Sequence, residues 1–496
     1  MKRIVIIGGG ITGLAVLHRL LERCRELGQS TEIVLLEASS RVGGVIQTDS
    51  REGFLLEAGP DCFISEKPEA LSLVHRLGID SHLISTNNEH RRSFIVRKGK
   101  LRAVPQGFQL LAPSRIWPFL TSDIFSFAGK ARMAADLVIP KKRSNGNDDE
   151  SLASFVRRRL GNEALARMAQ PMIGGIYTAD PERLSLRATF PRFLDLEASH
   201  RSIILGLFHA GRNSPPEEEA GTSGARYSLF LSFDQGMQLL VDSLAFRVGD
   251  LRVPLPGFEI TSTVRLRKTV EELKLEPKAR ASQWRVHTSR GDDYSADAVC
   301  LALPAYVSAQ LLAKLAPSLA GELRAIPYAS TATVNLGYRR EDIRHRLNGF
   351  GFVVPFVEKR SLIACTFSSV KFAGRAPGGC VLLRAFVGGA LQPEIFDLGV
   401  SRIIARVRAD LRDLLGIENK PLFAEVSKWA RSMPQYELGH LGRVKKIGDE
   451  LQKLPGLKIA GNIFAGAGIP DCIRSGEAVA DELLESFAID SQTKLN

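Results

Sequence analysis

The chain has 496 residues and a mass of 54.3 kDa, enough to bury a large core, and its length predicts two or three domains. Hydrophobic residues make up 44% and charged residues 24%, which excludes wholesale disorder and a fibrous repeat. No stretch of about 18 apolar residues is free of charge, so no spanning helix is expected. The six scattered cysteines indicate a reduced, cytoplasmic chain, and the nine histidines form no metal-binding pair.

The formal net charge is +12, and most of it lies in residues 91–143. That segment holds twelve lysines and arginines against two acids, Asp123 and Asp136. One interpretation is an ordinary solvated basic face. The other is attraction to an anionic partner, such as lipid head groups, nucleic acid or a substrate with several carboxylates.

The N-terminus has the order of elements typical of a dinucleotide-binding fold. The apolar run Ile4–Ile7 predicts a buried parallel strand, and it leads into the glycine turn of residues 8–13, with Gly8, Gly10 and Gly13 in a G-x-G-x-x-G pattern. Leucines at helical spacing follow, and a second apolar strand, residues 33–36, ends in Glu37. The turn and the helix N-terminus suit a pyrophosphate, and Glu37 suits the adenosine ribose.

A second glycine pair indicates which dinucleotide the chain binds. Arg41-Val42-Gly43-Gly44 closely follows Glu37, and residues 53–60 end in Glu57-Ala58-Gly59-Pro60. A nicotinamide enzyme does not need this pair, whereas an extended FAD requires the chain to pass close to its pyrophosphate and ribityl groups. The predicted cofactor is therefore FAD.

Residues 4–60 resemble the FAD-binding opening of the amine oxidase and phytoene desaturase superfamily. The other end of the chain agrees, because residues 457–462 predict a strand and a glycine turn, and a final helix opens at residues 472–476. In that superfamily such a segment places a helix N-terminus against the flavin. A cysteine near the C-terminus attaches the flavin in some members, but Cys472 stands elsewhere in the motif, so the FAD is expected to be noncovalent.

Other passages resemble one family, the oxygen-dependent porphyrinogen oxidases of haem biosynthesis, which act on protoporphyrinogen IX or coproporphyrinogen III. They cover residues 175–181, 200–204, 350–355, 429–436 and 468–476. The resemblance implies oxidation of a porphyrinogen by six electrons, taken two at a time by FAD and passed to oxygen as hydrogen peroxide. It requires no nucleophile, catalytic acid or base, or metal from the protein.

The resemblance also implies the fold class and the domains. We expect an α/β protein with a discontinuous Rossmann-like FAD-binding domain, a mixed-sheet substrate domain and a helical, membrane-associating insertion. The expected boundaries are 1–90, 226–300 and 426–496 for the FAD-binding domain, 91–225 for the helical insertion and 301–425 for the substrate domain. Residues 264–273, 284–288 and 298–302 predict strands, and the polar residues 143–150 and 213–224 predict loops.

The predicted site residues fall into two groups. Those expected at the FAD are Gly8, Gly9, Gly10, Ile11, Thr12, Gly13, Glu37, Ala38, Arg41, Gly43, Gly44, Val45, Gly59, Pro60, Asp61, Cys62, Val270, Trp429, Ala467, Gly468 and Ile469. Those expected at the substrate, by resemblance, are Ser93, Gly175, Val353, Thr366 and Phe386.

Two of the substrate positions depart from the family pattern. Thr366 stands where a leucine is usual, and Ser93 stands where plant and animal enzymes place an arginine that holds a propionate. Arg91 and Arg92 lie just upstream. We therefore expect coproporphyrinogen III, which has four propionates, to be oxidised at least as well as protoporphyrinogen IX.

Residues 108–140 interleave aromatic residues with cations, which predicts either helical core or a patch for an anionic membrane surface. The expected partners are a porphyrinogen and oxygen, with an anionic membrane face and a neighbouring haem-pathway enzyme as further candidates and no nucleic acid. The expected location is the cytoplasm, at the inner face of the cell membrane. Two alternatives stay open: a related amine oxidase or carotenoid desaturase, and a noncatalytic flavoprotein of the haem pathway.

Overall fold

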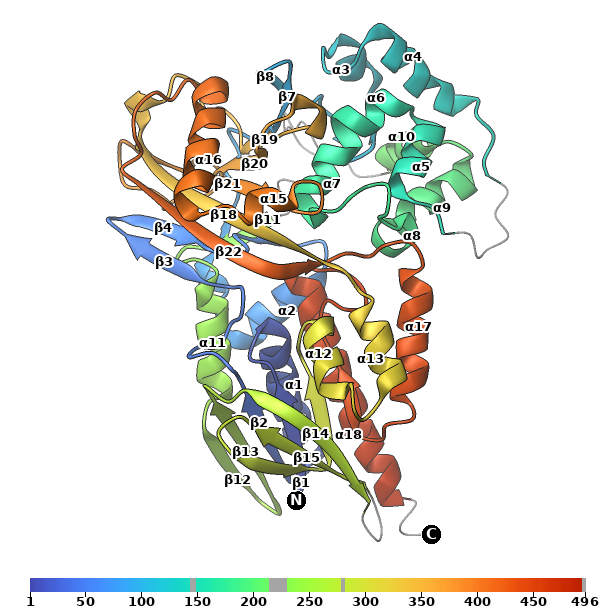
Figure 1. Cartoon of the computed structure of the whole chain (residues 1–496), viewed down its shortest axis with the longest axis vertical. Coiled ribbons are helices and arrows are strands. Elements are labelled where there is room, and N and C mark those ends of the chain that lie inside the picture. The colour runs from blue at the N-terminus through green and yellow to red at the C-terminus, as the bar shows by residue number, and fades with distance from the viewer. Residues whose placement is uncertain (143–148, 214–229, 278–281, 493–496) are drawn as a thin grey trace.

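The computed structural model describes residues 1–142, 149–213, 230–277 and 282–492 (Figure 1). The molecule has two halves. One contains a six-stranded sheet and both chain ends, and the other contains a seven-stranded sheet beside a group of helices. Most of the segments predicted as loops, residues 143–148 and 214–224, lie outside the described residues.

The six-stranded sheet joins four distant parts of the chain. Its strand order is β12 (Leu251–Leu255), β13 (Phe258–Arg265), β2 (Thr31–Leu36), β1 (Lys2–Ile7), β17 (Ala298–Leu301) and β23 (Leu457–Ile459). All neighbours are parallel except β12 and β13. Residues 4–7 of β1 are buried, as expected for a central strand covered on both faces.

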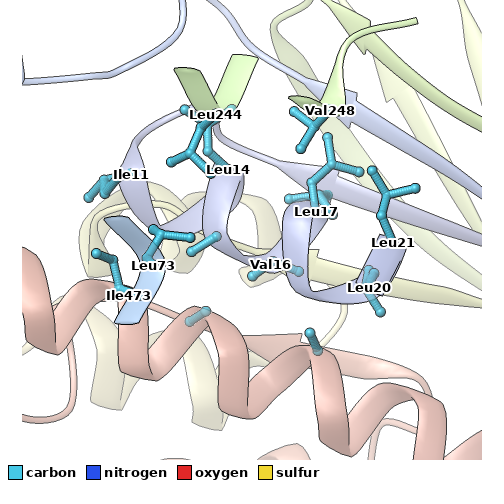
Figure 2. Packing of buried hydrophobic residues seen from close by; sticks show 14 of the residues in the cluster. Ile11, Leu14, Val16, Leu17, Leu20, Leu21, Leu73, Leu244, Val248 and Ile473 are labelled. Atoms are coloured by element: carbon cyan, nitrogen blue, oxygen red, sulfur yellow. The ribbon is translucent and has the colours of Figure 1, made fainter. Parts of the chain in front are cut away.

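Helix α1 (Ile11–Leu27) fills the core on one face of this sheet. Leu14, Leu17, Leu20 and Leu21 are buried against α2 (Pro68–Leu77), α11 (Gln238–Val248) and α18 (Ile469–Gln492), as Figure 2 shows. The approach of α18 to α1 requires a glycine, since a Cβ at Gly476 would lie 2.7 Å from the Thr12 carbonyl oxygen. The helix predicted after the first glycine turn is confirmed.

A second layer covers the opposite face of the sheet. It consists of a three-stranded sheet, β14 (Val270–Pro277), β15 (Ser282–Thr288) and β16 (Asp293–Ala296), and three helices, α12 (Ala305–Leu312), α13 (Pro317–Arg324) and α17 (His440–Leu451). The prediction of one strand over residues 264–273 is wrong. The chain turns between β13 and β14, where Arg267 has a φ of 57° and the Lys268 amide donates to the Glu37 carbonyl.

The seven-stranded sheet forms the core of the other half. Its order is β22 (Phe423–Pro434), β18 (Tyr328–Arg339), β21 (Cys380–Gly388), β20 (Leu362–Phe367), β19 (Gly351–Val353), β7 (Phe94–Arg97) and β8 (Lys100–Ala103). Helix α16 (Val400–Leu415) packs on one face, against residues such as Val334, Leu383 and Ala385. The opposite face, called here the front face, points toward the rest of the molecule.

The helical group follows β8 in the chain. It contains α3 (Ile116–Thr121), α4 (Phe127–Ala134), α5 (Leu152–Arg159), α6 (Asn162–Ala164), α7 (Gln170–Tyr177), α8 (Leu186–Thr189), α9 (Pro191–His200) and α10 (Ile203–Asn213). Strands β7 and β8, which we placed with the helices, pair within the seven-stranded sheet. The domain boundaries themselves stay a prediction.

The remaining elements are short. They are the pairs β3 (Thr48–Arg51) with β4 (Phe54–Glu57) and β9 (Phe108–Gln109) with β10 (Ala112–Pro113), the sheet β5 (Phe63–Ile64), β11 (Phe230–Phe233) and β6 (Leu83–Ser85), and the helices α14 (Ser368–Lys371) and α15 (Pro393–Phe396). Within the described ranges, every helix is too short or too polar to span a bilayer.

A fully buried ion pair holds the helical group together. Asp136 accepts a hydrogen bond from Arg159 Nε at 2.5 Å, and its other oxygen accepts from the Ser202 hydroxyl and the Ile204 amide. Both charged side chains have no exposed surface. Without Asp136, the buried Arg159 guanidinium loses its nearest carboxylate and keeps the longer contact of its Nη1 with Glu197 at 3.5 Å.

We therefore predict that Asp136→Ala lowers the free energy of unfolding by about 3–5 kcal/mol. The matched control is Asp123→Ala, because Asp123 pairs with Arg102 at the surface and such pairs contribute no more than about 1 kcal/mol. Urea titrations followed by circular dichroism measure both variants. Equal losses in the two would contradict the prediction.

Candidate flavin and substrate site

The predicted glycine turn lies at the carboxyl end of β1 and fits tightly packed backbone. A Cβ at Gly13 would lie 1.9 Å from the Gly8 carbonyl oxygen, and one at Gly8 would lie 2.4 Å from the Ala302 carbonyl oxygen. Gly10 differs, because nothing lies within 4 Å of the place its Cβ would take. The turn is thus closed on the sheet side and open at Gly10, where a pyrophosphate can approach the amides at the start of α1.

Glu37 ends β2 beside this turn. Its carboxylate accepts a hydrogen bond from the Gly9 amide at 2.6 Å and one from the Ser39 amide at 2.8 Å. The neighbouring Ala38 is exposed. The carboxylate is therefore held in place next to an open surface, which suits it to accept hydrogen bonds from a ribose.

The second glycine loop packs on the first. The Gly43 amide donates to the Gly9 carbonyl at 2.8 Å. The Arg41 guanidinium donates to the carbonyls of Val42, Gly44 and Ile46, so this side chain shapes the loop. Gly44 and Val45 are exposed beside Gly10, which extends the open surface along the turn.

The closing segment comes back to the same place. Gly476 of α18 packs on the start of α1, since a Cβ there would lie 2.7 Å from the Thr12 carbonyl oxygen, and the Gly461 amide donates to Ser475 at 2.8 Å. Helix α18 begins at Ile469, and Gly468 just before it is exposed. The N-termini of α1 and α18 therefore lie side by side, and each presents free amides and a partial positive charge.

Two other predicted FAD residues are placed by backbone contacts. Lys268 and Arg267 donate from their amides to the Glu37 and Ser39 carbonyls, which brings the start of β14, at Val270, to the ribose side of the turn. At the opposite end, the indole Nε1 of Trp429 donates to the Ala58 carbonyl at 2.8 Å.

The segment from Glu57 to Cys62 links the two halves of the molecule. Gly59 presses against Val45, because a Cβ there would lie 1.7 Å from the Val45 carbonyl oxygen. On its other side the segment is bound by the front face, where Thr333 donates to the Ala58 carbonyl at 2.9 Å and Asn335 to the Glu57 carbonyl at 3.0 Å.

Three of the five predicted substrate residues, Val353, Thr366 and Phe386, lie on this front face. Thr333 lies opposite Phe386, Ala364 lies opposite both Phe386 and Val353, and opposed residues share a face of a sheet. Thr366 follows two residues after Ala364 and so points the same way. Val353, Thr366 and Phe386 are half-buried, as expected of side chains that line an open cavity.

Helix α7 lies opposite the sheet and forms a second wall. Gly175 is exposed, and a Cβ there would lie 3.8 Å from Val353. A small, open hollow adjoins this contact and is lined by Gln170, Gly174, Val354, Phe356, Ile363 and Gln392, among others. Ser93 is buried just before β7, while Arg92 is exposed. The roles of all these residues stay predictions.

Several residues at this junction were not predicted. Lys371 and Arg384 are buried and contact the Glu57–Cys62 segment, as do Thr333 and Asn335. The only sequence signal was the alternation of Thr331, Thr333 and Asn335 with apolar residues along β18. That pattern indicates one polar face, but it does not say what the face touches.

Two titratable groups at the junction have shifted pKa values. Burial raises the pKa of Glu57 to about 6, although its carboxylate accepts hydrogen bonds from the Met237 amide and the Thr48 hydroxyl. Burial, reinforced by the charge of Asp61, raises the pKa of the Cys62 thiol to about 12, so this thiol is neutral.

The donor set fits a flavin dinucleotide. The open cradle at Gly10 and the two helix N-termini suit a pyrophosphate, and Glu37 suits the ribose. Gly59 packs behind the exposed Val45, and the segment around it contacts the front face, so the turn and the front face are joined. Among the described residues, no group of three or more histidine, cysteine or acidic side chains is arranged to hold a metal.

These features define a flavoprotein with a two-sheet oxidoreductase fold. The family model of the flavin containing amine oxidoreductases matches residues 11–484, and the chain belongs to this family. The expected α/β fold and the FAD cofactor are thereby confirmed.

Individual proteins with similar sequences or structures are named as porphyrinogen oxidases. The chain is 34% identical to "Coproporphyrinogen III oxidase" of Bacillus subtilis (strain 168), over 97% of this chain and 98% of that protein. It is 30% identical to the chloroplastic protoporphyrinogen oxidase of Nicotiana tabacum, over 97% and 85%. A solved structure of a provisionally named protoporphyrinogen oxidase from Exiguobacterium sp. 255-15 has a TM-score of 0.82 at 27% identity, covering 97% of this chain and 98% of the other.

We predict that Glu37→Ala weakens FAD binding by roughly 1.5–3 kcal/mol, because the ribose loses a charged hydrogen-bond partner. Glu32→Ala is the matched control, since Glu32 lies on β2, the strand that leads into Glu37, and pairs with the partly exposed Arg3. Titration of the apoprotein with FAD, followed by flavin fluorescence, gives both dissociation constants. An unchanged dissociation constant for Glu37→Ala would show that this carboxylate holds the glycine loop and does not bind the ribose.

Proposed function

We propose that this protein oxidises coproporphyrinogen III to coproporphyrin III in haem biosynthesis, with FAD as cofactor, oxygen as acceptor and hydrogen peroxide as product. The observation that carries the proposal is the similarity over 97% of the chain to three proteins named coproporphyrinogen III oxidase, at 34, 33 and 30% identity. The proteins named protoporphyrinogen oxidase match at 27–30%.

The chain's own residues have three tasks in this reaction. The glycine turn and Glu37 bind the nucleotide end of the cofactor. The front face, with Val353 and Phe386, and helix α7, with Gly175, form two walls that hold the macrocycle against the Gly59 segment. The apolar character of these walls keeps water from the reacting carbon.

Bound FAD supplies the redox chemistry, by accepting electron pairs from the substrate and passing them to oxygen. The protein contributes no nucleophile to this reaction. Its role is to position the substrate, which agrees with the apolar side chains of Val353 and Phe386 and with the missing side chain of Gly175.

Charge supports the choice of coproporphyrinogen III. Ser93 replaces the arginine that the family resemblance places there, and the exposed Arg92 and half-buried Arg91 precede it. A basic rim without one fixed guanidinium favours the substrate with four carboxylates over the one with two.

We predict a higher kcat/KM for coproporphyrinogen III than for protoporphyrinogen IX. The rates are measured in parallel by porphyrin fluorescence and by hydrogen peroxide release. Putrescine, an amine, is the control substrate and should release no peroxide. Oxidation of putrescine but of neither porphyrinogen would replace this proposal with an amine oxidase, and a strong preference for protoporphyrinogen would contradict the choice of substrate.

We also propose that α3 and α4 dock on an anionic membrane surface. The aromatic residues of this segment separate into two groups, because Phe119 and Phe125 are buried whereas Trp117 and Phe127 are 75% and 89% exposed. Ile116, Leu120 and Val138 are exposed as well. Exposed apolar side chains within a basic segment match the interface of an anionic bilayer.

Replacing both Trp117 and Phe127 with serine should lower the binding to phosphatidylserine-containing vesicles more than tenfold, since each buried aromatic contributes about 1.5–3 kcal/mol. Phe246→Ser is the matched control, because Phe246 is 85% exposed on α11 at a distance from this segment. Sedimentation with vesicles measures the bound fraction. Equal binding to neutral and anionic vesicles at low salt would contradict the proposed attraction between this basic segment and anionic lipid.

A further inference from the structure

A buried group of charges lies directly against the predicted flavin-binding segment. It consists of Asp61, Lys371 and Arg384, called here the Asp61 cluster. Lys371 and Arg384 are only 7% and 3% exposed. Lys371 Nζ lies 3.0 Å from one Asp61 oxygen, and Arg384 lies 3.6 Å from the other.

The cluster is fastened to the backbone and side chains of residues 59–62. Arg384 donates to the Gly59 carbonyl, and Lys371 donates to the Cys62 sulfur at 3.2 Å. Arg384 also stacks on Phe386, with its guanidinium carbon 4.8 Å from the ring centre. Both cations therefore contact the flavin segment. Arg384 also contacts Phe386, a predicted wall residue of the substrate cavity.

The cluster carries an excess of positive charge. Two cations share one carboxylate, since Cys62 is a neutral thiol. Burial raises the pKa of Asp61, but Lys371 and Arg384 outweigh that effect and hold this pKa below its ordinary range, so the carboxylate is ionised.

The surroundings do not cancel the excess. Arg375 and Glu57 line the same small hollow, and they add one cation and one carboxylate. Lys371 Nζ otherwise faces the rings of Phe230 and Phe372, at 5.1 and 4.9 Å. In such a place a charge interacts more strongly than in water.

We propose that Lys371 and Arg384 raise the reduction potential of the bound FAD, and that Asp61 offsets part of their effect. Reduction of FAD by two electrons with uptake of one proton leaves a flavin of one additional negative charge, and a buried net positive charge stabilises that state relative to the oxidised one. The inference rests on the proposed binding of FAD at Gly59. It assigns to Lys371 of helix α14 and Arg384 of strand β21 a part in setting how readily the flavin takes electrons from a porphyrinogen.

The test measures the two-electron potential of the holoenzyme by equilibration with an indicator dye during slow enzymatic reduction. Lys371→Met should weaken the binding of reduced FAD, relative to oxidised FAD, at least tenfold, which corresponds to a shift of about 30 mV to lower potential. Arg384→Gln should shift the potential in the same direction. Asp61→Asn should shift it to higher potential.

Lys314→Met is the control, because this lysine side chain is 92% exposed and lies 3.8 Å from Glu272, away from the Asp61 cluster. The opposite signs separate electrostatics from loosened structure, which would move the potentials of Lys371→Met and Asp61→Asn in one direction. Equal potentials in Lys371→Met and Lys314→Met, or shifts of one sign throughout, would overturn the inference. A wild-type protein that binds no FAD would instead overturn the proposed function.

Discussion

The segment Glu57–Cys62 is the constraint on which the rest of the structure depends. Gly59 has no side chain, so it can press against the Val45 carbonyl of the dinucleotide half. The carbonyls of Glu57, Ala58 and Gly59 all accept hydrogen bonds from residues of the front face. One short stretch of backbone therefore fixes the distance between the two sheets, and with it the position of a substrate relative to the flavin.

The two halves that the Glu57–Cys62 segment joins have different tasks. The six-stranded sheet supplies backbone amides and one carboxylate, which suit phosphates and a ribose of fixed chemistry. The seven-stranded sheet supplies side chains on an antiparallel face, where a single substitution changes the cavity without disturbing the core behind it. Families that share such a frame can change substrate while they keep the cofactor.

The buried ionic groups of the chain divide in the same way. Asp136 and Arg159 satisfy one another and several backbone groups deep in the helical half, where they hold helices together. Lys371 and Arg384 outnumber their carboxylate and lie at the joint beside the flavin segment. The dense hydrogen bonding of Asp136 and Arg159 is typical of a structural ion pair, whereas the excess of cations at the joint agrees with the proposed effect of Lys371 and Arg384 on the flavin.

The sequence by itself determined the nucleotide half of the site. Strand, glycine turn, helix and Glu37 are local features, since each depends on neighbours within about one supersecondary unit, and spacing alone reveals them. Only the tertiary structure showed that Lys371 and Arg384 lie beside Gly59, because more than 300 residues separate them along the chain. It also decided which aromatic residues of α3 and α4 face solvent. Trp117 and Phe119 have equivalent sequence surroundings, but they lie on opposite sides of one helix. Contacts of that kind depend on which sheet edge or helix face packs against a distant element, and no local pattern contains that information.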